Sequence, residues 1–212
     1  MNNVFVIDNP LAKHYLTILR DKSTKPSIFR QYMRKLGFIL GYEVSKYIDW
    51  KNTIVETPLA KSNGLKIDKP ILVIGVLGAS IPLVQGILDA YPQAGLGLIA
   101  ARRIETTSGI DVEIYYQRLP DLLDKYNVMI GDPMLATGTT LLKIIDLVIE
   151  KRAFKIMVLS VIASRFGIEN IRKKYSDIPI LVVEIDQELN DRFFIVPGLG
   201  DAGDRSLSPE IY

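Results

Sequence analysis

Two stretches of the chain hold small and polar residues in patterns that suit ligand binding. The first, Asp132-Pro-Met-Leu-Ala-Thr-Gly-Thr-Thr140, lies between the apolar run 127–131 and an apolar segment with helical spacing. This pattern predicts a strand, a loop and a helix, where free backbone N–H groups and the positive end of the helix dipole meet. Its three threonine hydroxyls add donors, and Gly138 permits a close approach of the ligand. A phosphate site and a plain turn capped by a threonine both fit the pattern.

The second stretch, Phe194-Ile-Val-Pro-Gly-Leu-Gly-Asp-Ala-Gly-Asp-Arg205, is rich in glycine and charge near the end of the chain. Gly198, Gly200 and Gly203 match the letters of a dinucleotide-binding motif. Such a motif opens a helix early in a strand-helix-strand unit and needs an acidic residue about 20 positions later. Here the sequence offers neither, so the stretch is interpreted as an irregular loop whose backbone faces a small ligand.

The elements around these stretches alternate between apolar runs and amphipathic segments. The predicted strands are 71–76, 95–101, 127–131, 155–163 and 180–185, and helices are expected between them. This alternation predicts an α/β fold with a mostly parallel central sheet and right-handed crossovers. Ligands of such sheets bind near the carboxyl ends of the strands, where both stretches would lie.

The outer segments are predicted less regularly. Helices are expected from Pro10 to Arg20 and over 29–47, and the second has an apolar stripe at three- and four-residue spacing. A strand over Thr53–Thr57 would enter a loop from Leu59 to Pro70, and Ser80 would cap the helix that follows the strand 71–76. A turn signal near residue 108 predicts a hairpin arm over about 104–119, which either packs on a partner subunit or covers a site.

Composition places the chain among ordinary globular proteins of one domain, residues 1–212. Of its residues 48% are hydrophobic and 24% are charged, and the net charge is +2, too mild to demand nucleic acid or a membrane surface. Without cysteine there is no thiol nucleophile and no disulfide framework, which suits the cytoplasm. No signal peptide is expected, and the uncharged run 70–88 is broken by proline and glycine as in a buried strand, turn and helix.

Together the two stretches resemble the uracil phosphoribosyltransferase family, which makes UMP from uracil and 5-phospho-α-D-ribose 1-diphosphate (phosphoribosyl diphosphate). The resemblance covers nearly the whole chain, and further short motifs match family landmarks in the right order: Leu16–Lys22, Glu56–Leu59, Tyr115–Tyr116, Leu119–Pro120 and Ile185–Asn190. It implies a type I-like phosphoribosyltransferase fold, with a hairpin arm and a C-terminal hood loop that binds the base. Residues 1–50 and 193–212 would form the hood and tail.

The resemblance also implies roles for individual residues. The residues expected to bind phosphoribosyl diphosphate are Arg103, Asp132, Pro133, Met134, Leu135, Ala136, Thr137, Gly138, Thr139, Thr140 and Asp201. Those expected to bind uracil are Ile195, Gly200, Asp201 and Ala202. Arg103 and Asp201 are the expected catalytic residues, because the reaction needs positioning and neutralisation of the diphosphate rather than a general base. Mg²⁺ would arrive on the diphosphate with no direct protein ligand, and His14, the only histidine, is interpreted as structural.

One position departs from the family. At the turn after the strand 71–76 family members usually carry Leu-Arg-Ala, and here the sequence is Leu77-Gly78-Ala79. Loss of a charged contact to the leaving group costs about 2 to 4 kcal/mol of transition-state stabilisation. The alternative to an active transferase is therefore a catalytically weakened nucleotide-binding regulator. The resemblance further implies a homo-oligomer and a GTP or CTP effector, for which Lys22 and the region 30–35 are basic enough, although a solvated helix face explains them better.

Overall fold

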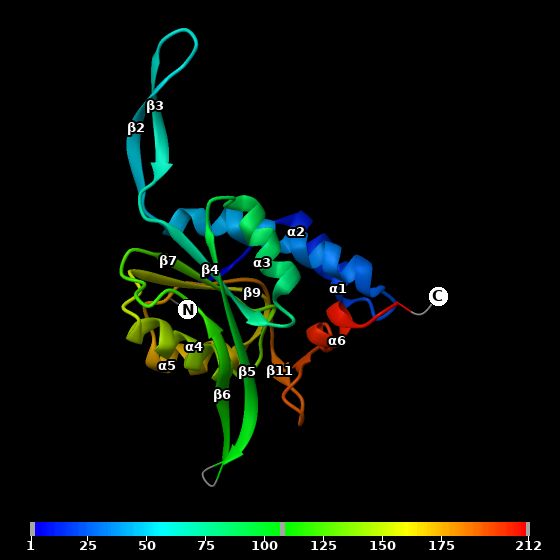
Figure 1. The fold of residues 1–212 in the computed structure, drawn as a ribbon. Coiled ribbons are helices and arrows are strands. Elements are labelled where there is room, and N and C mark those ends of the chain that lie inside the picture. The colour runs from blue at the N-terminus through cyan, green and yellow to red at the C-terminus, as the bar shows by residue number, and fades with distance from the viewer. Residues whose placement is uncertain (1–2, 107–108, 211–212) are drawn as a thin grey trace.

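The computed structural model describes residues 3–106 and 109–210. Its centre is a sheet with helices on both faces (Figure 1). The strands lie side by side in the order β1 (Val4–Val6), β10 (Ile180–Asp186), β9 (Lys155–Ser164), β7 (Asn127–Gly131), β4 (Ile71–Leu77), β5 (Gly95–Thr106) and β6 (Gly109–Arg118). All pair in parallel except β6, which is antiparallel to β5, and the short β8 (Met134–Leu135) pairs with β9. The predicted α/β class with a mostly parallel sheet is confirmed.

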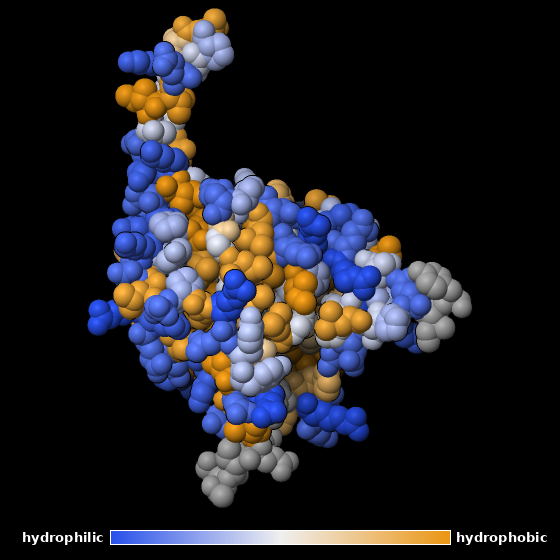
Figure 2. All heavy atoms as spheres, in the orientation of Figure 1, coloured by the Kyte–Doolittle hydropathy of each residue, from blue (hydrophilic) through white to orange (hydrophobic). Residues whose placement is uncertain are grey.

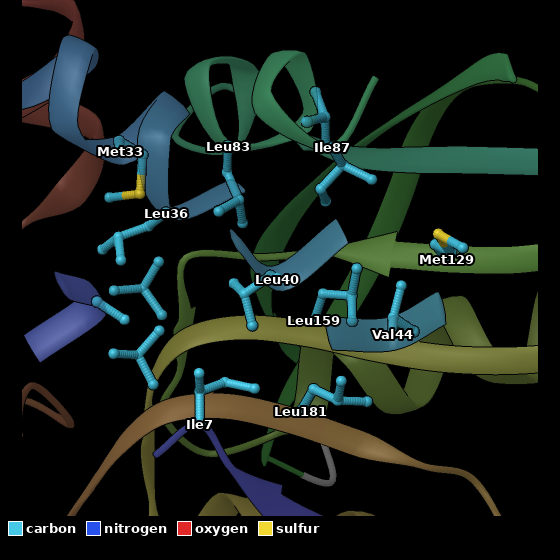
Figure 3. Packing of buried hydrophobic residues seen from close by; sticks show 14 of the residues in the cluster. Ile7, Met33, Leu36, Leu40, Val44, Leu83, Ile87, Met129, Leu159 and Leu181 are labelled. Atoms are coloured by element: carbon cyan, nitrogen blue, oxygen red, sulfur yellow. The ribbon is translucent and has the colours of Figure 1, made fainter. Parts of the chain in front are cut away.

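Helices close both faces of this sheet. On one face lie α1 (Pro10–Arg20), α2 (Pro26–Val44) and α3 (Ile81–Ala90), and on the other α4 (Thr139–Glu150) and α5 (Arg165–Lys174) (Figure 1). The predicted stripe of α2 is buried, and its side chains pack with those of α3 and the strands (Figure 3): Met33, Leu36, Leu40, Val44, Leu83, Ile87, Met129, Leu159 and Leu181. Full burial of each such side chain contributes about 1.5 to 3 kcal/mol, so both layers hold the strand ends in place.

A hairpin replaces the loop predicted from Leu59 to Pro70. Strands β2 (Trp50–Glu56) and β3 (Lys61–Ile67) pair antiparallel and project from the body as an arm (Figure 1). The loop prediction was wrong because β3 reads Lys-Ser-Asn-Gly-Leu-Lys-Ile, which lacks the apolar alternation of a half-buried strand. Most of the residues of both strands are exposed, so the pairing rests on backbone hydrogen bonds rather than burial.

The hairpin expected over about 104–119 is formed by β5 and β6. The pairing of β5 with β6 runs from Leu98 opposite Arg118 to Thr106 opposite Gly109. In Figure 1 this hairpin extends away from the β2–β3 arm, on the opposite side of the body. Its turn at 107–108 falls outside the described residues.

The C-terminal segment from Glu188 to Leu207, here called the hood, folds over the carboxyl end of the sheet. It contains β11 (Glu188–Leu189), β12 (Ile195–Val196) and α6 (Ala202–Leu207). Elsewhere in the chain, the short 3-10 helix η1 (Ser45–Tyr47) follows α2. The prediction of an irregular loop over 194–205 was wrong at its C-terminal end, which belongs to α6. The Asp201 carboxylate accepts a hydrogen bond from the backbone N–H of Asp204 at 2.9 Å and caps this helix. Within the described residues no helix is both long and apolar enough to cross a membrane.

Candidate active site

The carboxyl ends of four strands meet the two ligand-binding stretches at one edge of the sheet. Asp132 follows β7, Ser164 ends β9, Asp186 ends β10, and the turn Leu77–Ser80 follows β4. Because neighbouring strands here are parallel, their last residues converge on the same edge. The hood reaches this edge from the other side, and two adjoining cavities lie there.

The smaller cavity, here called the loop cavity, sits at the start of α4. It has a volume of about 50 Å³ and is lined by Asp132, Met134, Leu135, Ala136, Thr137, Gly138, Thr140 and Leu141. Gly138 is the N-cap residue of α4 with φ of 78°, a left-handed conformation that favours glycine. Since glycine has no side chain to cap the helix, the first-turn N–H groups receive no side-chain cap, and the alternative of a turn capped by a threonine is not what the structure forms. The Thr137 and Thr139 hydroxyls lie 3.1 Å apart beside them.

The first turn of α5 holds this loop in position. The Ser164 hydroxyl donates to the Ala136 carbonyl at 2.5 Å, and the Asn170 amide donates to the Thr137 carbonyl at 3.0 Å. Gly167 lies against the loop so closely that a Cβ there would be 2.2 Å from the Ala136 carbonyl oxygen. The loop is therefore held by close packing against the Gly167 backbone and by two side-chain donors at α5 and its N-cap. Donor groups that are fixed in this way form a preorganised anion site.

The larger cavity, here called the hood cavity, lies between this loop and the hood. It has a volume of about 280 Å³ and is lined by Ala79, Asp132, Pro133, Met134, Ala136, Arg192, Phe193, Phe194, Asp201, Ala202 and Gly203. Asp132, Met134 and Ala136 line both cavities, so a ligand with a phosphate at one end and a ring at the other can span them. Apolar walls with a few polar groups are typical of small-molecule sites.

Asp132 is a partly buried acid that lines both cavities. Its surroundings exclude most solvent from the carboxyl group, and this burial raises the pKa of Asp132 to about 6. The backbone N–H of Met134 donates to the carboxylate at 3.2 Å and opposes the rise. A carboxylate held here at neutral pH has unused lone pairs directed at the cavities, and it suits a ligand with neighbouring hydroxyl groups.

Two arginines tie the hood to the N-terminal helices. Arg20 of α1 donates to Asp186 at 2.8 and 2.9 Å and to the Gly198 carbonyl at 2.7 Å, while the backbone N–H of Gly198 donates to Asp186 at 2.9 Å. Arg205 donates to the carbonyls of Leu199 at 2.8 Å and Asp21 at 2.6 Å. These contacts fix the glycine segment, which has φ of 61° at Gly198 and the cis peptide bond Val196–Pro197.

The structure brings most of the predicted site residues together. Pro133 lines the hood cavity, Leu135, Thr137, Gly138 and Thr140 line the loop cavity, Asp132, Met134 and Ala136 line both, and Asp201 and Ala202 line the hood cavity. Three predicted residues, Thr139, Ile195 and Gly200, line neither cavity. The Thr139 hydroxyl contacts that of Thr137. Ile195 is buried and Gly200 adopts φ of 75°, so both shape the segment that carries the Asp201 side of the hood cavity. Arg103 lies in β5, and its side chain is outside the described part of the chain.

Sequence reasoning missed part of the hood cavity wall. Arg192, Phe193 and Phe194 line the cavity, together with Ala79 and Gly203. The available signal was a cation and two exposed aromatic residues directly before Ile195, in a segment already assigned to ligand binding.

The turn after β4 carries the departure from the family pattern. The peptide bond Leu77–Gly78 is cis, and a Cβ at Gly78 would meet the Leu207 Cδ1 atom at 2.9 Å. Ser80 is the N-cap residue of α3, as predicted, but its side chain makes no capping hydrogen bond. Ser80 has helical φ and ψ and is fully buried, and its hydroxyl makes no hydrogen bond to any described residue. The chain has already entered helical geometry at Ser80, so its side chain points away from the α3 N–H groups.

The fold is that of the type I-like phosphoribosyltransferases. The chain aligns with a hypoxanthine phosphoribosyltransferase from Staphylococcus aureus at a TM-score of 0.53 and 15% identity, covering 76% of each chain, and this likeness shows the fold. The loop between β7 and α4, with its Gly138 N-cap and threonine lining, offers backbone N–H groups and hydroxyls of the kind that suit an anion.

The chain belongs to the uracil phosphoribosyltransferase family, whose model matches residues 6–207. A uracil phosphoribosyltransferase from Aeropyrum pernix is 44% identical over 204 residues, which cover 96% of this chain and 95% of that relative. The solved structure of the AQ2163 protein from Aquifex aeolicus has a TM-score of 0.90 at 33% identity and covers 99% of this chain and 100% of its own. The chain thus makes UMP and diphosphate from uracil and phosphoribosyl diphosphate, and the regulator alternative is not favoured.

Proposed function

We propose that the two cavities divide the substrates of UMP synthesis between them. The loop cavity takes the 5-phosphate on the N–H groups and hydroxyls of Thr137–Thr140, and Asp132 accepts hydrogen bonds from the ribose hydroxyls. The hood cavity takes uracil beside Asp201 and Ala202. The observation that carries this proposal is the shared wall of Asp132, Met134 and Ala136, which joins the phosphate end to the base end.

Uracil is selected by the backbone of the hood. Its edge presents acceptor, donor and acceptor in turn, and backbone N–H, C=O and N–H groups of the segment 195–202 can match that order. Cytosine inverts part of the edge and would leave buried groups without partners, which costs about 1 to 3 kcal/mol for each group. Arg20, Asp186 and Arg205 hold the segment rigid, as this selection requires.

The reaction is a displacement at the anomeric carbon of the ribose. Nitrogen N1 of uracil forms the new bond while the bond to diphosphate breaks, the electron pair leaves with diphosphate, and the N1 proton passes to solvent. The protein aligns the two substrates, excludes water and stabilises the charge of the leaving group. Arg103 serves the leaving group, because a guanidinium offers several donors to phosphate oxygens and stays charged.

Mg²⁺ accompanies the diphosphate. No group of three metal-ligating side chains occurs within the described residues, and the carboxylates of Asp132 and Asp201 both line the hood cavity. Mg²⁺ usually keeps several waters and binds substrate phosphates, so it would need no direct protein ligand here, and the two carboxylates fit as acceptors of hydrogen bonds from its waters. When bound, the ion neutralises charge on the leaving group.

Turnover tests the proposal directly. Purified protein with uracil, phosphoribosyl diphosphate and Mg²⁺ is expected to release UMP and diphosphate in equal amounts, and tight UMP binding without turnover would contradict the proposal. Arg103→Ala is expected to lower kcat by tens to several hundredfold, equal to about 2 to 4 kcal/mol, because a charged donor to the leaving group is lost. Arg102→Ala is the matched control, since Arg102 is paired with Glu113 at 2.7 Å. Equal rates for both variants would remove Arg103 from the site.

The β2–β3 arm supports assembly of the chain into a homo-oligomer. Strand alternation places Trp50, Ile54 and Leu65 on one face of the arm, and they are 41%, 69% and 61% exposed. Figure 2 shows hydrophobic residues at the surface of the projecting arm. A lone two-stranded hairpin is marginally stable in water, so this apolar face gains stability when a second copy covers it. Light scattering is expected to give a mass above that of one chain, and the double variant Ile54→Lys with Leu65→Lys to lower it. An unchanged mass would place the contact elsewhere.

The remaining expectations stay predictions. A GTP or CTP effector is implied by the family resemblance, but two of the basic residues offered for it have structural partners: Arg30 donates to the Ser206 carbonyl at 2.8 Å, and Arg34 pairs with Asp89 at 2.6 Å. This favours the interpretation of that region as a helix face. The cytoplasmic location rests on the lack of cysteine alone.

A further inference from the structure

The two cavities are poor in positive charge for the substrate they accept. Phosphoribosyl diphosphate carries a phosphate monoester and a diphosphate, whereas the described side chains that line the cavities include two acids, Asp132 and Asp201. Within the described part of the chain, Arg192 is the only cation lining either cavity. Mg²⁺ and Arg103, both assigned to the diphosphate above, offset part of this negative charge, and a further cation on the cavity wall would offset more of it.

The turn facing the diphosphate supplies no charge of its own, because Gly78 stands where a guanidinium is expected. Nearby arginines are committed elsewhere. Arg102 pairs with Glu113 at 2.7 Å and stacks 5.7 Å from the Tyr115 ring, and Arg205 donates to carbonyls of the hood and α1–α2 segment. Neither lines the hood cavity.

Arg192 lies on the hood wall of the cavity that the turn after β4 also lines through Ala79. It sits on the connection between β11 and β12, and the Asn190 side chain accepts hydrogen bonds from the backbone N–H groups of Arg192 and Phe194, each at 3.0 Å. The backbone is thereby fixed while the Arg192 side chain remains exposed. Arg192 and Ala79 line the same cavity, and Ala79 is the residue next to Gly78.

We propose that Arg192 binds the diphosphate group of the substrate from the hood side of the cavity and replaces the cation that Gly78 cannot provide. This rests on the proposed function, which brings uracil together with the anomeric carbon, and so with the diphosphate on that carbon, at the hood cavity. A guanidinium on the hood and a glycine at the turn are complementary, because the small turn leaves room for a diphosphate contacted from the opposite wall.

Arg192→Ala is expected to raise KM for phosphoribosyl diphosphate about ten- to hundredfold and to leave KM for uracil unchanged. Calorimetry with Mg²⁺-diphosphate should show a similar loss of affinity, whereas ribose 5-phosphate, which lacks the diphosphate, should bind the variant as it binds the unmodified protein. Arg192→Lys should recover part of the loss. Lys173→Ala, at an exposed position of α5, controls for the change in net charge.

A second variant tests the replacement itself. Gly78→Arg in the Arg192→Ala background is expected to restore diphosphate affinity at least tenfold, and position 78 has room because the flexible end of Leu207 is the only described neighbour within 4 Å of an added Cβ. An equal loss of ribose 5-phosphate affinity, a change in KM for uracil, or no recovery by either Arg192→Lys or Gly78→Arg would overturn the proposal. Diphosphate binding needs no turnover, so its outcome is separate from failure of the proposed reaction.

Discussion

Asp132→Asn is expected to lower kcat/KM for phosphoribosyl diphosphate by about a thousandfold. The carboxylate is assigned to two ribose hydroxyls, and each hydrogen bond to a charged acceptor contributes about 1.5 to 3 kcal/mol. An asparagine keeps the shape and can still accept from the Met134 N–H at 3.2 Å, but it retains only one weaker acceptor for the ribose. Steady-state kinetics with the concentration of phosphoribosyl diphosphate varied measures the loss.

The same residue predicts an acid limb in the pH profile. Burial raises the pKa of Asp132 to about 6, so the carboxyl group of the free protein becomes protonated as pH falls through that value. Its acceptor is then lost, and kcat/KM for phosphoribosyl diphosphate is expected to fall about tenfold per pH unit below 6. The phosphates of the substrate titrate in this range as well, but their titration affects the unmodified protein and Asp132→Asn equally. A limb that is identical in Asp132→Asn would therefore contradict the assignment.

Stability is expected to change in the opposite direction. Because the folded pKa of Asp132 lies above the unfolded value of about 3.9, the folded state binds more protons between pH 4 and 6, and ionisation progressively destabilises it as pH rises through this window. Asp132→Asn removes the free-energy cost of ionising this carboxyl group in the folded state. The variant is expected to raise the free energy of unfolding by about 1 to 2 kcal/mol at pH 7.5 and to leave it unchanged below about pH 4. Asp124→Asn, on the exposed loop before β7, serves as the control.

A gain of stability together with a loss of turnover would identify Asp132 as a residue kept for function. Buried, ionised groups without full compensation are tolerated where chemistry needs them. A loss of both stability and activity would instead indicate that the carboxylate supports the loop through the Met134 N–H. Denaturant unfolding followed at pH 4 and pH 7.5 separates the two results.

The sequence predicted those parts of the molecule that local patterns determine. The strand, loop and helix around Asp132–Thr140 follow from an apolar run, small residues and helical spacing, and the structure forms them within a residue or two. The strand predicted over Thr53–Thr57 overlaps β2, but β3 was missed, because the two strands pair through their backbones with little burial and burial is what periodicity detects. The phosphate assignment itself came from the resemblance, since a capped turn fitted the residues equally well.

Contacts between distant segments were beyond such reasoning. Arg20 and Asp186 are 166 positions apart, and their pairing through Gly198 shows only when α1 and the end of β10 are side by side. Arg192 was overlooked for the same reason, because a cation in a polar stretch has no periodic signal and its place on the cavity wall depends on the hood. Pairings of this kind are set by tertiary packing, which overrides local propensity.

Gly167→Ala is expected to abolish measurable UMP formation, with kcat/KM lower by more than about a thousandfold. The added Cβ would lie 2.2 Å from the Ala136 carbonyl oxygen and 3.0 Å from that of Leu135, both backbone atoms of the loop that lines the cavities. Neither can move aside as a flexible side chain would, so the loop must shift off α5 and break the Ser164 and Asn170 hydrogen bonds to it. A shift of about 1 Å in a positioning element costs about a hundredfold in rate by itself.

The overpacking also costs stability, about 1 to 3 kcal/mol in the free energy of unfolding. The matched control is Gly95→Ala, the same substitution at the start of β5, where the added Cβ would meet the end of the Leu72 side chain, its Cδ1 atom, at 3.3 Å. Circular dichroism and denaturant unfolding should show both variants folded at 25 °C, with Gly95→Ala retaining its rate. If Gly167→Ala kept its affinity for ribose 5-phosphate, the loop would not depend on α5, and the 5-phosphate would have to be held by groups other than the Thr137–Thr140 backbone.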